Sequence, residues 1–161
     1  ISFPRSTGHI PCYYNYKVSA RGYYNKHGSV KSPGRDYVFD SPEALFPFGY
    51  GLSYTSFEYS DLTAVRSDNG IKVSFKVKNI GNVKAKETSL VFVSQEFCST
   101  TPFVKRLRRF AKKEYEPGEE RELTFTLNDD DISYIDLNMK KAVGSGVFKI
   151  TVDKLECEVT I

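Results

Sequence analysis

Strict alternation between apolar and polar residues in the second half of the chain is the feature that most constrains its fold. In 71–77, Ile, Val, Phe and Val alternate with lysine and serine, which is typical of a strand with one buried and one solvated face. The same period of two recurs in 123–127, 148–152 and 155–161, and the apolar run 90–93 suits a central strand. Turn signals rich in Asn and Gly separate these segments, and no amphipathic helix interrupts them. The pattern predicts short antiparallel strands in two packed sheets.

The predicted fold class is all-β, an immunoglobulin-like or fibronectin type III-like β-sandwich. The chain has no Trp, so the Cys…Trp…Cys marks of immunoglobulin domains are absent and the fibronectin type III-like variant is favoured. The three cysteines, Cys12, Cys98 and Cys157, are too widely spaced for a disulfide framework or a CxxC metal site. We interpret them as buried structural thiols, and a Cys98–Cys157 bridge stays an open alternative.

Residues 1–54 differ from the rest of the chain in composition and in periodicity. They hold 12 of the 23 Phe and Tyr residues, five of the seven prolines and six of the 11 glycines, without a clean period of 2 or 3.6. Proline and glycine break regular structure, whereas so many aromatic rings are costly to leave in water. Long structureless segments are also uncommon inside compact domains. We therefore interpret this stretch as an extended, aromatic-rich arm that lies on another surface.

Charge and hydropathy exclude several classes of partner. There are 23 Lys and Arg against 20 Asp and Glu, a net charge of +3, so we expect no nucleic-acid partner and no membrane partner. No apolar run approaches the roughly 18 residues of a membrane-spanning helix. The N-terminus shows no signal peptide. We expect either that one was removed or that the chain begins mid-protein, and we favour the second explanation.

Acidic residues, histidines and Ser53 do not form a recognisable metal or catalytic site. Asp129–Asp131 with Asp136 lack the spacing and the glycine of an EF-hand loop, so we interpret them as a solvated turn. His9 and His27 have no third ligand at zinc spacing. Ser53 is not within a Gly-x-Ser-x-Gly elbow and is interpreted as a turn serine. We expect no catalytic residue, no metal and no cofactor.

The segment Lys105–Lys113 carries six positive charges in nine residues. A basic strip with an aromatic residue can follow phosphates. However, Leu107 and Phe110 resemble core anchors, and flanking lysines and arginines commonly protect an edge strand from aggregation. We therefore predict a solvated edge strand here.

A resemblance to one enzyme family runs along the whole chain. The stretch Phe46–Thr55, Phe-Pro-Phe-Gly-Tyr-Gly-Leu-Ser-Tyr-Thr, followed by Phe57, resembles the signature that opens the C-terminal domain of glycoside hydrolase family 3 enzymes. Further matches occur in the family's order: Phe3-Pro4-Arg5, Gly8, Ile10-Pro11-x-Tyr13-Tyr14-Asn15, Gly34-Arg35-Asp36-Tyr37, Asn79-x-Gly81, Leu107-x-x-Phe110, Pro117-Gly118-Glu119, Asp131-Ile132-Ser133-Tyr134 and Gly146-x-Phe148. Arg109 stands where the family usually has Gly.

The resemblance implies a larger enzyme of β-glucosidase or β-xylosidase type. In this family a (β/α)-barrel supplies an Asp nucleophile, an α/β sandwich domain usually supplies the acid/base carboxylate, and the fibronectin type III-like domain comes last. Such enzymes retain configuration by double displacement. We assign 1–20 to a remnant of the α/β sandwich domain, 21–54 to the linker arm and 55–161 to the β-sandwich. No residue matches the nucleophile or acid/base motif, so neither role is transferred.

The expected function is therefore structural. The domain would stabilise and dock onto the upstream catalytic domains of a secreted or periplasmic exo-β-glycosidase. A carbohydrate-binding module, which would need a row of coplanar exposed aromatics, and a protein-interaction domain are the alternatives. Arg35, Asp36, Phe48 and Tyr50 are the candidates for domain docking or for the rim of a nearby carbohydrate pocket. An apolar docking patch on the isolated chain could drive self-association.

Overall fold

The computed structural model describes residues 2–8, 12–17, 31, 43–95 and 97–161. The chain divides into two compact units, Ile1–Gly51 and Leu52–Ile161. The assignment of 1–20, 21–54 and 55–161 to three parts stays a prediction, because most of 1–54 lies outside the described residues. In the described part of the chain, no helix is long and apolar enough to cross a membrane.

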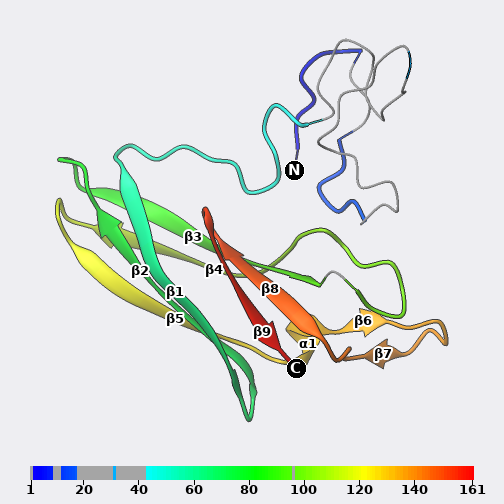
Figure 1. The fold of residues 1–161 in the computed structure, drawn as a ribbon. Coiled ribbons are helices and arrows are strands. Elements are labelled where there is room, and N and C mark those ends of the chain that lie inside the picture. The colour runs from blue at the N-terminus through cyan, green and yellow to red at the C-terminus, as the bar shows by residue number, and fades with distance from the viewer. Residues whose placement is uncertain (1, 9–11, 18–30, 32–42, 96) are drawn as a thin grey trace. The chain divides into compact units, whose positions relative to one another are not determined.

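The second unit is a β-sandwich, which confirms the predicted fold class (Figure 1). One sheet has the order β1-β2-β5, with β1 (Phe57–Ser67), β2 (Gly70–Asn79) and β5 (Glu120–Leu127). The other has the order β4-β3-β8-β9, with β4 (Arg106–Tyr115), β3 (Ala85–Gln95), β8 (Val147–Val152) and β9 (Leu155–Thr160). A small sheet joins β6 (Tyr134–Ile135) to β7 (Lys141–Ala142), and α1 (Asp129–Ile132) is a single turn of helix. Every pairing between the described strands is antiparallel.

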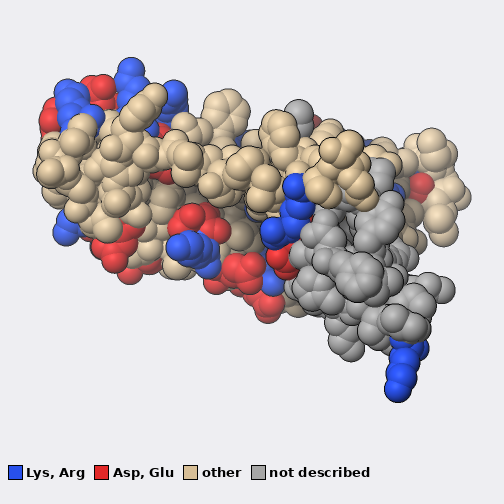
Figure 2. All heavy atoms as spheres, turned by 90° about the horizontal axis from the view of Figure 1, so that it is seen from above, with Lys and Arg blue, Asp and Glu red and all other residues tan. Residues whose placement is uncertain are grey.

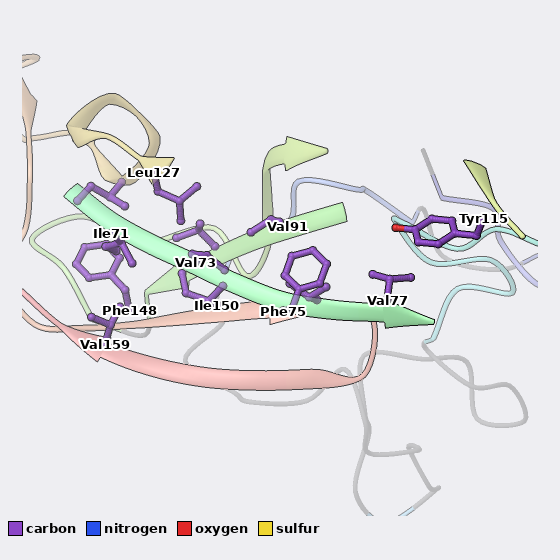
Figure 3. Close-up of a cluster of buried hydrophobic side chains, with 13 residues drawn as sticks. Ile71, Val73, Phe75, Val77, Val91, Tyr115, Leu127, Phe148, Ile150 and Val159 are labelled. Carbon is purple, nitrogen blue, oxygen red and sulfur yellow. The ribbon is translucent and has the colours of Figure 1, made fainter. Parts of the chain in front are cut away.

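The predicted alternation becomes the core between the two main sheets (Figure 3). The four apolar residues of 71–77 are at most 1% exposed, while the lysines and the serine between them are exposed or half-buried. Phe148, Ile150 and Val152 of β8 are 0% exposed and face them from the other sheet. The run 90–93 lies in β3, between β4 and β8, as predicted for a central strand. Burial of these side chains is the main force that holds the sheets together.

A β-bulge in β4 decides where the charges of the basic segment point. Arg109 lies opposite Val91 and Leu107 opposite Phe92, so Arg108 is the extra residue. Residues that lie opposite each other on paired strands share a face of the sheet. The bulge therefore places Arg109 on the inner face with the buried Val91, and Arg106 shares that face because it lies opposite Val93.

The same bulge corrects the predicted role of Leu107 and Phe110. Phe110 lies opposite Leu90 on the outer face of the sheet and is 66% exposed, so its interpretation as a core anchor is wrong. Leu107 is half-buried on the same face. The prediction that β4 is an edge strand is confirmed, but Arg106 and Arg109 are half-buried inward-pointing charges and not solvated ones. Inward-pointing charge is one of the devices that protect sheet edges from pairing.

The acidic segment is likewise only partly solvated. Asp129 and Asp130 are exposed, but Asp131 is 8% exposed, which corrects the prediction of a turn whose carboxylates all face water. The Asn128 side chain accepts a hydrogen bond from the Asp131 N–H, and the Asp131 carboxylate accepts one from the Asn128 N–H. This reciprocal capping box satisfies donors at the start of α1. Asp131 also receives two hydrogen bonds of 2.5 Å from the Arg109 guanidinium.

Candidate functional site

The candidate residues of the arm are only partly described. Arg35 and Asp36 lie outside the described residues. Phe48 is half-buried and meets the Tyr14 ring edge-on, with 5.3 Å between the centroids. Tyr50 is 53% exposed, and its ring lies 4.8 Å from that of Phe46. Phe48 and Tyr50 therefore pack on different rings, and their role at a pocket rim stays a prediction.

Backbone and aromatic contacts join the start of the first unit to its end. The Phe3 N–H donates to the Phe46 carbonyl at 3.0 Å, and the Leu45 N–H donates to the Phe3 carbonyl at 2.9 Å. The Phe3 and Phe46 rings also meet edge-on, and the Arg5 guanidinium donates to the Glu43 carbonyl. These contacts hold the described segments 2–8 and 43–46 together, which periodicity alone did not predict.

The chain enters the sandwich beside the side chain of Asn79, which is fully buried and fully hydrogen-bonded. Its Oδ1 accepts from the Thr55 hydroxyl at 3.2 Å and from the Gly81 N–H at 3.1 Å. Its Nδ2 donates to the carbonyls of Val83 at 2.9 Å and Tyr115 at 3.3 Å. The segment 52–56 leads into β1, and we call it the entry segment. The Asn79 amide thus joins the entry segment, the β2–β3 turn and the end of β4. Buried networks of this kind are worth more than their separate bonds when every member is satisfied.

Gly81 leaves room for the close approach of Thr55. A Cβ at position 81 would lie 2.0 Å from the Thr55 Oγ1, so a larger residue would force the Thr55 side chain to move away from its hydrogen bond to Asn79. The Ile80 N–H also donates to the Ser56 carbonyl at 2.9 Å, so the segments 52–56 and 80–83 lie against each other. The Asn79-x-Gly81 motif, which was expected to form a turn, therefore also contacts the segment 52–56.

A second polar cluster holds the entry segment from the side of β3. The carboxylate of Glu87 accepts from the Ser53 hydroxyl and, at 2.9 Å, from the Tyr59 hydroxyl. The Tyr59 oxygen also lies 3.2 Å from the hydroxyl of the buried Ser89. Burial raises the pKa of the Tyr59 phenol, and the negative charge of Glu87 adds to this effect. Ser53 lies in irregular chain before β1, and its hydroxyl has a structural partner.

Four exposed apolar side chains lie on these two hydrogen-bonded segments, and we call them the entry patch. Leu52 is 88% exposed and Tyr54 95%, and on the facing turn Ile80 is 55% and Val83 50% exposed. Figure 2 shows lysines and arginines close to acidic residues over the described part of one face, in keeping with the near-even charge balance.

The histidines and cysteines considered in the sequence form no metal site within the described residues. His9 and His27 lie outside them. Cys12, Cys98 and Cys157 form no disulfide among the described residues, so the Cys98–Cys157 bridge is not formed. All three are half-buried, whereas full burial was expected. Among the described residues, no group of three or more His, Cys, Asp and Glu is placed to hold a metal ion.

Comparison with known proteins gives the family. Residues 87–155 match the fibronectin type III-like domain. A thermostable β-glucosidase B from Acetivibrio thermocellus is 36% identical over 165 residues, which cover 99% of this chain and 22% of the relative. A putative β-xylosidase from Formosa agariphila is 35% identical over 156 residues, which cover 94% of this chain and 19% of the relative. The chain belongs to the C-terminal, fibronectin type III-like region of glycoside hydrolase family 3.

A solved structure places this family 3 region in the same fold. The crystal structure of a β-glucosidase from Listeria innocua, in complex with isofagomine, superposes with a TM-score of 0.85 at 29% identity. The superposition covers 99% of this chain and 23% of that enzyme. This family 3 region therefore spans about a fifth of the length of the relatives it matches.

Proposed function

We propose that this chain is a non-catalytic accessory domain that stabilises and docks onto the catalytic domains of a retaining exo-β-glycosidase, of β-glucosidase or β-xylosidase type. The observation that carries the proposal is the coverage of the alignments: nearly the whole chain matches about a fifth of each relative. The relatives thus have room for catalytic domains outside the matched region. Carbohydrate degradation is the process in which such an enzyme would act.

The use of the carboxylates in the sandwich supports the same proposal. Glu87 is held by two hydroxyl groups and Asp131 by a guanidinium, so both act in packing. A retaining glycosidase needs two carboxyl groups about 5 Å apart across a bound sugar. The paired carboxylates of the enzyme would therefore belong to the catalytic domains.

The surface of the strands gives little support to a carbohydrate-binding module. Among the Phe and Tyr residues in the described strands, Phe110 alone is exposed. Phe92, which lies on the same outer face, is 4% exposed, and the Lys105 ammonium lies 3.9 Å from the centre of its ring. Sugar stacking would need a row of open rings.

A secreted or periplasmic location is part of the proposal. One relative, from Salmonella typhimurium, is a periplasmic β-glucosidase that is 32% identical over 93% of this chain. Cell fractionation of the native host, with an antibody against this chain, tests the location. Recovery in the cytoplasm would contradict it.

Hydrolysis of nitrophenyl β-glucoside and nitrophenyl β-xyloside tests the function. Three proteins are compared: the complete polypeptide, this chain alone, and the complete polypeptide without this chain. We expect turnover by the complete polypeptide, none by the chain alone, and faster thermal inactivation of the shortened enzyme. Turnover by the chain alone, or a shortened enzyme as stable as the complete one, would contradict the proposal.

A further inference from the structure

Asn69 and Gly70 form the only Asn-Gly pair in the sequence, and they lie where the β1–β2 hairpin turns. Asn69 is exposed, and its side-chain amide has no hydrogen-bond partner among the described residues. Ser67 pairs with Gly70 across the turn, and its hydroxyl donates to the Gly70 carbonyl at 3.2 Å. The Asn69 amide is therefore in contact with water and can rotate toward the backbone of the next residue.

Two other described asparagines show what is particular to Asn69. Asn79 is fully buried, and its amide makes four hydrogen bonds, so it can neither rotate nor meet water. Asn82 is exposed in a turn, but Val83 follows it, and a branched side chain shields the backbone nitrogen. Glycine has no Cβ, so the nitrogen of Gly70 lacks this shield. Asn69 thus combines an unpaired amide with an open nucleophile on the following residue.

These two groups can react with each other without a catalyst. The backbone nitrogen of Gly70 forms a bond to the side-chain carbonyl carbon of Asn69. The amide C–N bond breaks, and the amide nitrogen leaves as ammonia with the proton of the Gly70 N–H. Water then opens the five-membered succinimide ring at either of its two carbonyl groups. One opening gives aspartate and the other gives isoaspartate, whose main chain runs through the side chain.

The backbone at Gly70 is closely packed against β5. Its φ is 117°, and a Cβ there would lie 1.9 Å from the Leu127 carbonyl oxygen. Leu127 is 0% exposed and pairs with Ile71, which is also 0% exposed. Isoaspartate at position 69 adds one carbon to the main chain directly before this contact. The longer turn would displace Gly70 and disturb the pairing of Ile71, because closely packed interiors do not absorb added atoms.

We propose that Asn69 is a site of spontaneous covalent modification, at which ring closure with Gly70 yields isoaspartate and weakens the pairing of β2 with β5. The ring closes when the turn opens locally, and such openings at exposed turns cost little free energy. Water is the only co-reactant. The inference concerns the chemistry of this chain alone, so it does not depend on the proposed function.

The rate of conversion is the first test. The folded chain is incubated at mildly alkaline pH, digested and mapped by mass spectrometry, and isoaspartate is identified by labelling with a protein isoaspartyl methyltransferase. We expect Asn69 to be converted at least about tenfold faster than Asn82, because no side chain shields the Gly70 nitrogen. Asn69→Gln retains the amide but requires a larger ring, so it should show no conversion over the same time. Equal rates at Asn69 and Asn82, or conversion of Asn69 only in urea, would overturn the inference.

The stability of the modified chain is the second test. The isoaspartate form is separated by ion exchange, and its urea midpoint is compared with those of the parent and of Asn69→Asp. Asn69→Asp carries the same charge on an ordinary backbone, and it should unfold at the midpoint of the parent because position 69 is exposed. We expect the isoaspartate form alone to unfold at lower urea. Equal midpoints for the isoaspartate form and Asn69→Asp would show that the pairing of β2 with β5 is not weakened, and would overturn the inference.

Discussion

At the scale of single residues, Asn79 contributes more contacts than its position in a turn motif suggests. Its amide makes four hydrogen bonds to three segments, and its side chain has no access to solvent. Leaving a buried donor or acceptor unpaired costs about 1–3 kcal/mol. The spacing of Asn and Gly in the sequence identifies the turn, but not Thr55, which lies 24 residues away and supplies one of these bonds.

We expect Asn79→Ala to lower the free energy of unfolding by about 2–4 kcal/mol, because several buried groups lose their partner together. Urea unfolding followed by far-UV circular dichroism measures the change. Asn82→Ala is the matched control, since Asn82 is exposed in the same turn and should change stability by less than about 0.5 kcal/mol. Equal effects of the two substitutions would contradict the role of Asn79.

Tyr115 presents the opposite case. Its side chain is 0% exposed, and its hydroxyl has no hydrogen-bond partner among the described residues. We expect Tyr115→Phe to leave stability unchanged or to raise it by about 1 kcal/mol, because the substitution removes a desolvated polar group. Tyr59→Phe is the comparison and should destabilise by about 1–2 kcal/mol, since that hydroxyl donates to Glu87. Destabilisation by Tyr115→Phe would mean that its hydroxyl is bonded.

At the scale of secondary-structure elements, Arg109 and Asp131 join β4 to α1 across the open end of the sandwich. Their side chains are 31% and 11% exposed, and the pair is bidentate. Arg106 adds a bond of 2.7 Å to the Ser133 carbonyl, just before β6. Two arginines of the edge strand therefore hold the base of the β6–β7 hairpin.

We expect Arg109→Ala to destabilise the chain by about 2–3 kcal/mol, because it leaves the Asp131 carboxylate largely buried without its partner. A double-mutant cycle with Asp131→Ala should give a coupling energy of at least about 1 kcal/mol. Amide hydrogens of β6 and β7 should exchange faster in the Arg109→Ala chain. Arg121→Ala, which breaks an exposed pair with Glu119, is the control and should cost less than about 1 kcal/mol. Additive single effects would exclude the coupling.

Six of the seven described strands in the two main sheets were predictable from the sequence, but β1 and the facing of β4 were not. Period-two patterns fix the inward residues of β2, β5, β8 and β9, because one face of each strand must leave water. In β4 the bulge at Arg108 reverses the face of every residue beyond it. The apolar spacing of Leu107 and Phe110 suggested burial, yet both lie on the outer face. The Arg109–Asp131 pair joins residues 22 apart, and sequence spacing contains no signal for such a contact.

At the scale of the whole molecule, the buried phenol of Tyr115 and the half-buried phenol of Tyr59 make stability depend on alkaline pH. Burial raises the pKa of both Tyr59 and Tyr115 above the ordinary value near 10. Below pH 10 both are neutral in the folded and unfolded states, so their contribution is fully present. Above pH 10 the unfolded chain releases protons that the folded chain retains, and stability falls by at most about 1.4 kcal/mol per pH unit per group. The urea midpoint between pH 8 and pH 11 should show this fall. In a Tyr59→Phe, Tyr115→Phe chain it should be shallower, and an unchanged slope would assign the effect to other groups.

The division into two units at Leu52 predicts how far the chain can be shortened. All members of the hydrophobic core lie between Phe57 and Ile161, so the sandwich has the means to fold without the first unit. We expect residues 52–161 to unfold cooperatively, with a free energy within about 1 kcal/mol of the whole chain, because this piece retains Ser53 and Thr55. A piece that begins at Phe57 retains the same core but leaves Asn79 and Glu87 without these partners. It should be less stable by about 2 kcal/mol or more.

Urea unfolding of both pieces, followed by far-UV circular dichroism because the chain has no Trp, distinguishes the two cases. If both pieces are equally stable, the entry segment is only a tether. If the longer piece is the more stable one, the segment 52–56 is part of the domain, and the predicted boundary at residue 55 lies a few residues too late.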